Sequence, residues 1–350
     1  MSMKIFAVCK DRGGTDSVVP VVQELRKSGD EVLLFTNGLA SSLLVNADNI
    51  PVTSANEVIS KHGLPDILIS SMCSGGGVGW DLVLIMRNEK PDARVITITN
   101  GWSGAQLNAW ADKQYWPDLV CVNDWYERRE IEETWQDYSG EIIETGWPAL
   151  DSFVNYDQRA DRVRMREELD IPEDAKVILW AGQIKNTGLA LSELVTALNK
   201  VSAPDVYLIA REHSRLRSDN EFGPAEIEQS NQALAKLHGA KLIDGGQKEE
   251  PREIIATSDI VLSINSFALV EAAIMHKETI AIQYPNIYDL KTEFPLVALG
   301  ACERARDQES LHALLTHALN PGLGQGPAQS RAFKIDGQNA KRTANAILNQ

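Results

Sequence analysis

An apolar run that ends at Ile264 leads into residues whose types and order suit a nucleotide. Asn265 and Ser266 can cap a following helix, which would leave the backbone N–H groups around Phe267 open to a phosphate. Glu271 follows about one helical turn later, and from there a carboxylate can accept hydrogen bonds from both hydroxyls of a ribose. The alternative is a capped helix whose glutamate is solvated. We favour the interpretation that this segment binds a nucleotide.

Two more segments of this half follow apolar runs and carry polar or cationic residues. Ala181–Gly188 offers backbone amides, the Gln183 amide group and one cation, Lys185. Arg211 and His213 end another run: the guanidinium suits bidentate phosphate contact, and the imidazole can donate a hydrogen bond or act as a general base. A structural role for the histidine is the alternative.

Near the N-terminus an apolar run ends at Cys9 and is followed by the loop Lys10–Asp16, with Asp11, Gly13 and Gly14, before a predicted helix. Paired glycines let the backbone turn sharply and approach a ligand, and a helix N-terminus attracts anions. The alternative is a tight strand-to-helix turn with Asp16 as the N-cap. Both interpretations predict a loop at the edge of a sheet.

Several common motifs are absent from the sequence. It has no G-x-G-x-x-G and no P-loop pattern, which disfavours NAD and ATP in their commonest binding sites. The four cysteines lack C-x-x-C spacing, so neither a zinc ribbon nor a disulfide framework is predicted. Cys9 and Cys121 lie in apolar runs and are predicted to be core residues. We expect no cofactor and, because no D-x-D motif is present, no metal.

Six of the eight tryptophans lie in the stretch from Trp80 to Trp135. Trp80, Trp125 and Trp135 fall on predicted helices and are expected in the core. Trp102 and Trp147 fall on loops, where an indole can stack on a sugar ring or a nucleobase.

Short apolar runs alternate with helical patterns through the first half. Because the runs are apolar throughout, they predict strands of a sheet that is covered on both faces. The predicted strands are Lys4–Cys9, Glu31–Thr36, Asp66–Cys73, Ala93–Thr99, Asp118–Asn123 and Glu141–Thr145. The predicted helices are Asp16–Ser28, Trp80–Arg87 and Trp125–Trp135.

A second alternation follows a pause at Gly146–Pro148, where proline removes a backbone donor. Its predicted strands are Lys176–Ala181, Asp205–Ala210, Lys241–Asp244, Asp259–Ile264 and Glu278–Gln283. Its predicted helices are Arg159–Leu169, Leu189–Lys200, Ala225–Leu237, Pro251–Thr257, Phe267–His276 and Gln338–Asn349. Such alternation implies parallel sheets with right-handed crossovers.

The predicted fold class is therefore α/β, with two doubly wound, Rossmann-like domains that face each other across a cleft. Residues 1–150 form the first domain and residues 151–335 the second. Residues 336–350 form a C-terminal helix that can pack back on the first domain. Ligands of such folds bind at the carboxyl ends of the strands, so the cleft is the predicted site.

Composition excludes several classes of protein. Of the 350 residues, 43% are hydrophobic and 24% charged, which is typical of a folded chain. The net charge of −15 repels a phosphate backbone, so nucleic acid is not an expected partner. The N-terminus lacks the apolar region of a signal peptide, and no apolar stretch reaches the ~18 residues of a membrane span. We expect a soluble, cytoplasmic protein.

The second half resembles the nucleotide-binding domain of the GT-B superfamily, which includes many nucleotide-sugar glycosyltransferases and the UDP-N-acetylglucosamine 2-epimerases. The resemblance rests on Ser258–Ala272 with Lys277–Ile282, on Arg211–Arg215, and on Thr145–Asp151, which is similar to the epimerases' T-G-N-P-V-x-D. It implies that Glu271 binds the ribose, that Ser266 and neighbouring amides bind the phosphates, and that His213 lies near the diphosphate or the sugar.

Three departures from the epimerase pattern favour the wider class of transferases. Lys10–Gly13 is similar only in position to the family's arginine-bearing loop. Ser266–Phe267 replaces the epimerases' paired glycines, and Glu278–Thr279 replaces their proline.

The predicted activity is glycosyl transfer from a nucleoside-diphosphate sugar, held by the second domain, to an acceptor held by the first. Arg211 and Lys185 would stabilise the leaving diphosphate. Asp11, Asp16 and Asp124 are candidates for the base that deprotonates the acceptor, and Asp11 is preferred because it lies on the glycine loop. Two alternatives are a nucleotide-sugar epimerase and a non-catalytic nucleotide- or sugar-binding protein.

Overall fold

The computed structural model describes residues 3–44, 48–72, 76–102, 104–201, 205–213, 216–218, 221–243, 250–289, 294–319 and 332–349. The chain divides into two compact units. Unit 1 comprises Met1–Asn155 and Phe333–Gln350, and unit 2 comprises Tyr156–Ala332. The chain thus passes from one unit to the other twice, and the last helix belongs to unit 1.

Unit 1 contains a seven-stranded sheet in which every pair of neighbours is parallel, with the order β3-β2-β1-β4-β5-β6-β7. Its strands are β1 (Lys4–Cys9), β2 (Glu31–Thr36), β3 (Ile50–Pro51), β4 (Ile67–Ser71), β5 (Arg94–Ile98), β6 (Leu119–Val122) and β7 (Glu141–Glu144). Its α-helices are α1 (Arg12–Arg26), α2 (Leu39–Leu43), α3 (Ala55–His62), α4 (Val78–Glu89), α5 (Trp125–Thr134) and α14 (Asn339–Leu348). Short 3-10 helices are η1 (Asn108–Ala111), η2 (Lys113–Tyr115) and η3 (Pro148–Phe153).

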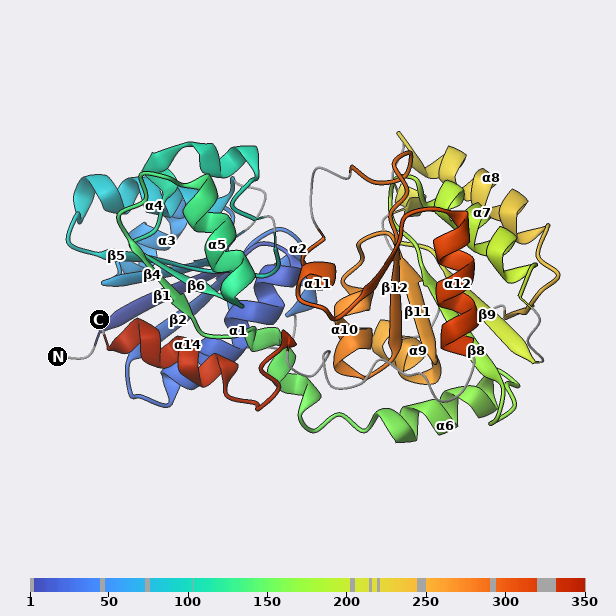
Figure 1. Ribbon diagram of the computed structural model, residues 1–350. Helices are drawn as coiled ribbons and strands as arrows, with labels where there is room; N and C mark the ends of the chain where they lie inside the picture. Colours follow the sequence, from blue (N-terminus) through green and yellow to red (C-terminus); the bar gives the residue numbers. More distant parts are fainter. Residues whose placement is uncertain are drawn as a thin grey trace. The chain divides into compact units, whose positions relative to one another are not determined.

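Both faces of this sheet are covered, as apolar strands require. One face packs on α1 and α14 through residues such as Ile69, Val18 and Ala344. The other packs on α3 and α4 through residues such as Leu68 and Leu82. The dark red helix α14 lies beside the blue helix α1, although the two are far apart in the sequence (Figure 1).

Unit 2 contains a six-stranded parallel sheet with the order β10-β9-β8-β11-β12-β13. Its strands are β8 (Lys176–Ala181), β9 (Val206–Arg211), β10 (Lys241–Ile243), β11 (Ile260–Ser263), β12 (Glu278–Ile282) and β13 (Glu303–Ala305). Its helices are α6 (Gln158–Glu168), α7 (Thr187–Leu198), α8 (Gly223–Leu234), α9 (Pro251–Thr257), α10 (Ala268–Ile274), α11 (Pro295–Ala298), α12 (Gln308–Leu319) and the 3-10 helix η4 (Leu216–Ser218).

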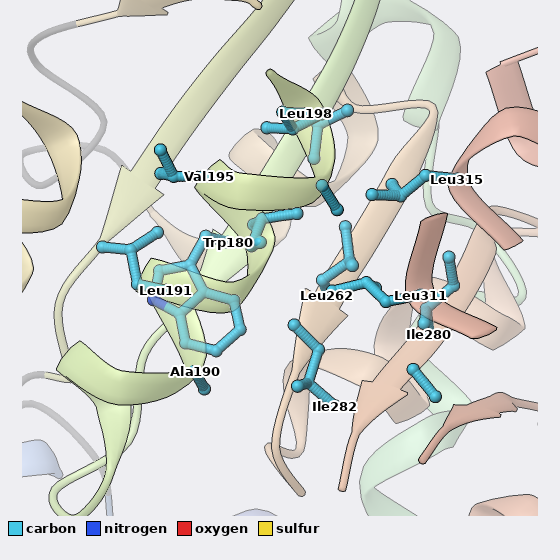
Figure 2. Close-up of a cluster of buried hydrophobic side chains, with 14 of the residues drawn as sticks. Trp180, Ala190, Leu191, Val195, Leu198, Leu262, Ile280, Ile282, Leu311 and Leu315 are labelled. Carbon is cyan, nitrogen blue, oxygen red and sulfur yellow. The ribbon is translucent and has the colours of Figure 1, made fainter. Parts of the chain in front are cut away.

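The core of unit 2 forms around Trp180 of β8, whose side chain is 2% exposed. Leu191 and Val195 of α7 lie near the indole, and Leu262 of β11 lies between α7 and Leu311 of α12 (Figure 2). Large apolar side chains from two helices and two central strands thus fix the sheet whose carboxyl edge carries the predicted site.

The structure confirms the predicted α/β class and the two doubly wound domains. The predicted strand and helix patterns correspond to observed elements, with ends that differ by a few residues. The largest difference is at α1, which begins at Arg12 because Asp11 caps it and Asp16 does not: Asp11 Oδ1 accepts the Gly14 N–H at 2.8 Å. Cys9 and Cys121 are free and buried, as predicted.

None of the helices in the described parts of the chain is both long and apolar enough to cross a bilayer.

Candidate functional site

The strand order of unit 2 places β8 at the centre, with β9 on one side and β11 on the other. The carboxyl ends of β8 and β11 therefore flank the point where the winding of the sheet reverses, which is where such folds bind ligands. Two hydrogen bonds join the strand ends: Ser263 Oγ donates to the Ala181 carbonyl at 2.5 Å, and Gly182 N–H donates to the Arg211 carbonyl at 2.8 Å.

Gly182 begins the turn between β8 and α7 and is tightly enclosed. A Cβ at this position would lie 2.9 Å from the Arg211 carbonyl oxygen and 2.9 Å from Thr187 Oγ1, so only glycine fits. Gln183 N–H donates to the same threonine oxygen at 3.1 Å. The first residue of α7 thus closes the turn that sequence analysis predicted to face a ligand.

The start of α7 already binds a carboxylate from the chain. Glu226, in the first turn of α8, accepts the N–H of Asn186 at 2.5 Å and the N–H of Gly188 at 2.8 Å. Lys185 is exposed, and its Nζ lies 4.1 Å from the centroid of the Phe222 ring. These amides were predicted to be open, and Glu226 was not predicted because no local pattern in the sequence marks it.

The end of β9 holds two of the predicted residues. Arg211 is the last residue of the strand, and both Arg211 and His213 are half-buried. Between them, Glu212 forms an ion pair with Arg217 at 2.8 Å. Ser214 and Arg215, which were part of the predicted cluster, lie outside the described residues. The Arg211 carbonyl accepts the N–H of Gly182, which follows β8. The predicted segments that begin at Ala181 and at Arg211 therefore lie at the same edge of the sheet.

The turn between β11 and α10 differs in detail from the expectation. Asn265 and Phe267 are exposed, and Ser266 is half-buried. Ser266 Oγ accepts the N–H of Ala268 at 3.2 Å, so this amide is not open to a phosphate as predicted. Glu271 lies in the first turn of α10 and is half-buried.

Gln283, just after β12, is a residue of this edge that sequence analysis missed. Its side chain is fully buried, and its Nε2 donates to the Ile264 carbonyl at 3.0 Å, which fixes the start of the β11–α10 turn. Its Oε1 has no hydrogen-bond partner within the described ranges. The only signal in the sequence is a polar residue at the end of an apolar strand.

In unit 1, Asp11, Gly13 and Gly14 do not form an open loop. Asp11 is the N-cap of α1, and both glycines lie in its first turn. A Cβ on Gly14 would lie 2.9 Å from the Cβ of Ser71, so this glycine allows α1 to pack against the end of β4. Asp16 is exposed and pairs with Arg12 at 3.7 Å.

The tryptophans that are buried and those that are exposed differ in part from the prediction. Trp135 is buried, as predicted, but Trp147 is 3% exposed and therefore a core residue, whereas Trp125 is 50% exposed. Trp102 is half-buried, and its indole N–H donates to Asp124 Oδ2 at 2.9 Å. The rings of Trp102 and Trp147 meet edge to face at 5.5 Å, which fixes the loop after β5.

Two acids follow β6, the half-buried Asp124 and the buried Glu127, and Glu127 was not predicted. Asp124 caps α5, and burial raises its pKa although the N–H groups of Glu127 and Trp102 lower it. Glu127 is 1% exposed, and its Oε2 accepts the Thr99 hydroxyl at 2.6 Å and the Asn123 N–H at 2.9 Å. Burial, followed by the charge of Asp124, raises the pKa of Glu127 well above its ordinary value.

A cavity of about 640 Å³ lies at the opposite edge of the same sheet. Its lining includes Asp118 and Gly140, which precede β6 and β7, together with Arg87 and Trp116. Asp118 forms an ion pair with Arg87 at 3.0 Å. This cavity is at the amino ends of the strands, away from the edge where such sheets bind ligands.

Comparison of the sequence with protein families gives one match. A model described as CDP-glycerol:poly(glycerophosphate) glycerophosphotransferase matches residues 95–223, little more than a third of the chain. The matched segment runs from β5 to the start of α8 and includes both Asp124 and Arg211. No curated protein matches the sequence.

Solved structures match over nearly the whole chain. A putative UDP-N-acetylglucosamine 2-epimerase from Listeria monocytogenes has a TM-score of 0.72 at 17% identity and covers 99% of this chain and 96% of its own. A glycosyltransferase from Rickettsia africae has a TM-score of 0.67 at 16% identity, with coverages of 100% and 99%. The wall teichoic acid polymerase TagF, soaked with CDPG, has a TM-score of 0.61 at 16% identity, with coverages of 99% and 88%. At these identities the similarity concerns the fold.

Proposed function

The chain has the two-domain fold of the GT-B superfamily, and we propose from this premise that it is a glycosyltransferase acting on a nucleoside-diphosphate sugar. Unit 2 binds the donor, and unit 1 binds an acceptor that offers a hydroxyl. The observation that carries the proposal is that Arg211 and His213 lie at the end of β9 and Glu271 lies in the first turn of α10, the helix that follows β11, while β9 and β11 flank the central strand β8.

Each of these residues suits one part of the donor. The half-buried carboxylate of Glu271 accepts hydrogen bonds from the ribose hydroxyls. Arg211 and Lys185 bind the diphosphate, and His213 lies near the diphosphate or the sugar. Because Glu226 occupies N–H groups at the start of α7, the diphosphate binds Arg211 at the end of β9 and the β11–α10 turn, in which Asn265 and Phe267 are exposed.

The reaction is a displacement at the anomeric carbon. The bond from this carbon to the diphosphate oxygen breaks, and the electron pair leaves with the nucleoside diphosphate. Arg211 and Lys185 stabilise the charge that develops on the leaving group, since fixed cations act most strongly where charge appears during the reaction. This chemistry needs no metal, so we expect transfer to continue in EDTA.

The family match favours a second candidate, transfer of glycerophosphate from CDP-glycerol. In that reaction the bond broken lies within the diphosphate, and CMP is released. Glycosyl transfer instead releases the whole nucleoside diphosphate. Chromatography of the released nucleotide therefore separates the two reactions without knowledge of the acceptor.

A thermal-shift screen of UDP, GDP, CDP, their sugars and CDP-glycerol tests the donor site. A ligand at one hundred times its dissociation constant adds about 2.7 kcal/mol to the stability of the unit that binds it. Glu271→Ala should abolish the shift. The matched control is Glu309→Ala, which removes an exposed glutamate from the first turn of α12 and should retain the shift. No shift with any of these ligands contradicts the proposal.

Product analysis in deuterated water decides between the remaining alternatives. An epimerase that acts at the second carbon of the sugar would exchange the proton at that carbon for deuterium, whereas a transferase would not. A protein that binds a nucleotide, forms no product and exchanges no proton would be a sensor, and the transferase proposal would then be wrong.

A further inference from the structure

The turn between β6 and α5 in unit 1 gathers polar groups that the proposed donor chemistry does not use. Asp124 Oδ1 accepts the N–H of Glu127 at 2.9 Å, and its Oδ2 accepts the indole N–H of Trp102 at 2.9 Å. Because β5 and β6 are neighbours in the sheet, both residues lie at its carboxyl edge. Asp124 remains partly accessible, so a bound hydroxyl can reach its carboxylate.

Buried polar atoms beside Asp124 are not satisfied. Glu127 Oε1 and both side-chain polar atoms of Asn123 have no hydrogen-bond partner among the residues that the structure describes. Most buried polar atoms in folded proteins are paired, and each exception needs an explanation such as a catalytic role or a bound water or ion. Three unpaired atoms on two residues of one turn therefore point to a site.

The two acids of this turn differ in their surroundings. Glu127 is enclosed by Thr99 and the backbone of Asn123, and burial together with the charge of Asp124 keeps its pKa high. Glu130 of the same helix raises the pKa of Glu127 further, and Glu144 of β7 raises that of Asp124. Burial raises the pKa of Asp124 as well, which makes its carboxylate a stronger base, whereas the pKa of the fully enclosed Glu127 is raised well above its ordinary value. Unequal surroundings of two carboxyls are found in active sites where the two groups have different roles.

We propose that Asp124 is the general base of the transfer reaction and that Glu127 is a positioning residue that holds it. This assignment rests on the proposed function. The acceptor O–H bond breaks and its proton passes to the Asp124 carboxylate. The acceptor oxygen forms a bond to the anomeric carbon of the donor, and the nucleoside diphosphate leaves with the electron pair. Asp124 then returns the proton to water.

Asp11, the base preferred from sequence alone, offers a direct comparison. It too caps a helix, since its Oδ1 accepts an N–H three residues later at 2.8 Å. Unlike Asp124, it is not accompanied by a buried second acid with an unpaired oxygen among the described residues. The family match at residues 95–223 also includes Asp124 and not Asp11.

The test measures nucleotide release from the donor that gives the thermal shift, with glycerol as the acceptor hydroxyl. Asp124→Asn keeps a good N-cap residue and an acceptor for Trp102, so folding should be retained. We expect kcat to fall by about 10²- to 10⁴-fold while the donor thermal shift stays unchanged. The matched control is Asp157→Asn, which replaces the N-cap of α6 and should leave kcat within about threefold of wild type.

Two substitutions of Glu127 separate positioning from catalysis. Glu127→Gln keeps a carbonyl oxygen for Thr99 and the Asn123 N–H and has no charge, as the protonated acid has none, so kcat should stay within about threefold. Glu127→Ala removes this acceptor, so kcat should fall at least tenfold with the KM for the donor unchanged. If Glu127 only positions Asp124, kcat should be retained in Glu127→Gln and lost in Glu127→Ala.

The remaining outcomes decide against the assignment. The assignment of Asp124 as the base is wrong if Asp124→Asn keeps full activity, or if activity is lost in Asp11→Asn instead. It is also wrong if Glu127→Gln loses as much activity as Asp124→Asn. None of these outcomes affects the proposal for the donor site. A wild-type protein that binds the donor but releases no nucleotide contradicts the proposed function, and this assignment with it.

Discussion

The guanidinium of Arg166 in unit 2 and the carboxyl of Glu127 in unit 1 are both almost fully buried, at 4% and 1% exposure, but they differ in their hydrogen bonds. The partners of Arg166 are the carbonyls of Pro172, Glu173, Ala175 and Thr257 and the carboxylate of Asp259. Glu127 has two donors on one oxygen and, within the described ranges, none on the other.

The two groups also lie at opposite ends of their sheets. Asp259 precedes β11 and so places Arg166 at the amino edge, whereas Glu127 follows β6 at the carboxyl edge. A buried charge whose hydrogen bonds are complete contributes to the fold and costs much to break. Burial raises the pKa of Glu127, whose second oxygen has no partner among the described residues, and Glu127 lies at the carboxyl edge, where ligands of such sheets bind. The difference between the structural Arg166 and the Glu127 proposed as a positioning residue is thus the completeness of their hydrogen bonds.

The largest effect that would sharpen this comparison is expected from Asp259→Ala. The substitution removes the carboxylate that pairs with Arg166 at 3.0 Å and Arg162 at 2.8 Å, and leaves a guanidinium buried without its counter-ion. We expect unit 2 to lose about 3–5 kcal/mol of stability. Hydrogen exchange of the β8 and β11 amides measures this free energy. A loss below about 1 kcal/mol would show that the pair is not structural.

The next largest effect is expected in the pH dependence of the stability of unit 1, through Glu127. Its pKa is raised in the folded state, so folded unit 1 holds a proton that the unfolded chain releases above about pH 4.5. The contribution of Glu127 to stability is therefore complete at low pH and falls by about 1.4 kcal/mol per pH unit until the folded pKa is passed. Glu127→Gln has no such proton, and its stability should fall less steeply with pH.

Tryptophan fluorescence can follow this unfolding in unit 1 alone. Trp180 is the one tryptophan of the sequence that lies in unit 2, so Trp180→Phe leaves the signal to unit 1. Urea titrations of this variant, with and without Glu127→Gln, give the two stability curves against pH. Parallel curves would mean that Glu127 is ionised when folded, and the contrast with Arg166 would be lost.

Trp102→Phe should have a smaller effect, about 1 kcal/mol. It removes the N–H that Asp124 accepts at 2.9 Å and keeps an aromatic ring against Trp147. The same urea titration measures the change, and the control Trp125→Phe alters a half-exposed indole and should be silent. Equal effects of the two substitutions would show that the Asp124 hydrogen bond adds no stability.

The smallest effect is expected from an exposed ion pair. Asp137 and Lys113 have side chains that are 76% and 60% exposed, and water screens their attraction. Asp137→Ala should leave the melting temperature within about 1 °C of wild type. A larger change would show that exposed pairs also contribute, which would weaken burial as the explanation for Asp259.

Much of the fold could be predicted from the sequence because the strands are buried on both faces. Continuous apolar runs predicted Glu31–Thr36 and Lys176–Ala181 with both ends as observed. The predictions did not include the short edge strands β3 and β13, whose two and three residues give no periodic pattern. Helices α3 and α12 were also missed, although Ser54 and Gly63 lie at the ends of α3 as helix-end signals.

The positions of the candidate residues in the fold could be predicted, but their hydrogen-bond partners could not. Polar residues at strand ends located Arg211 and Glu271 at the carboxyl edge, since topology alone brings strand ends together. The capture of the α7 amides by Glu226 and the burial of Glu127 depend on contacts between elements far apart in sequence. Such contacts leave no local pattern, so neither could be predicted from spacing.

The return of the chain to unit 1 has a consequence during synthesis. Helix α14 packs on α1, and Asp151 accepts the N–H groups of Asn339 and Ala340 at its start, at 3.0 and 2.8 Å. On the ribosome, every residue of unit 2 emerges before this helix does. Unit 2 can therefore fold before unit 1 is complete. Until α14 emerges, the apolar side chains of α1 that it covers stay exposed to solvent. A nascent chain halted before residue 333 should accordingly recruit chaperones through unit 1.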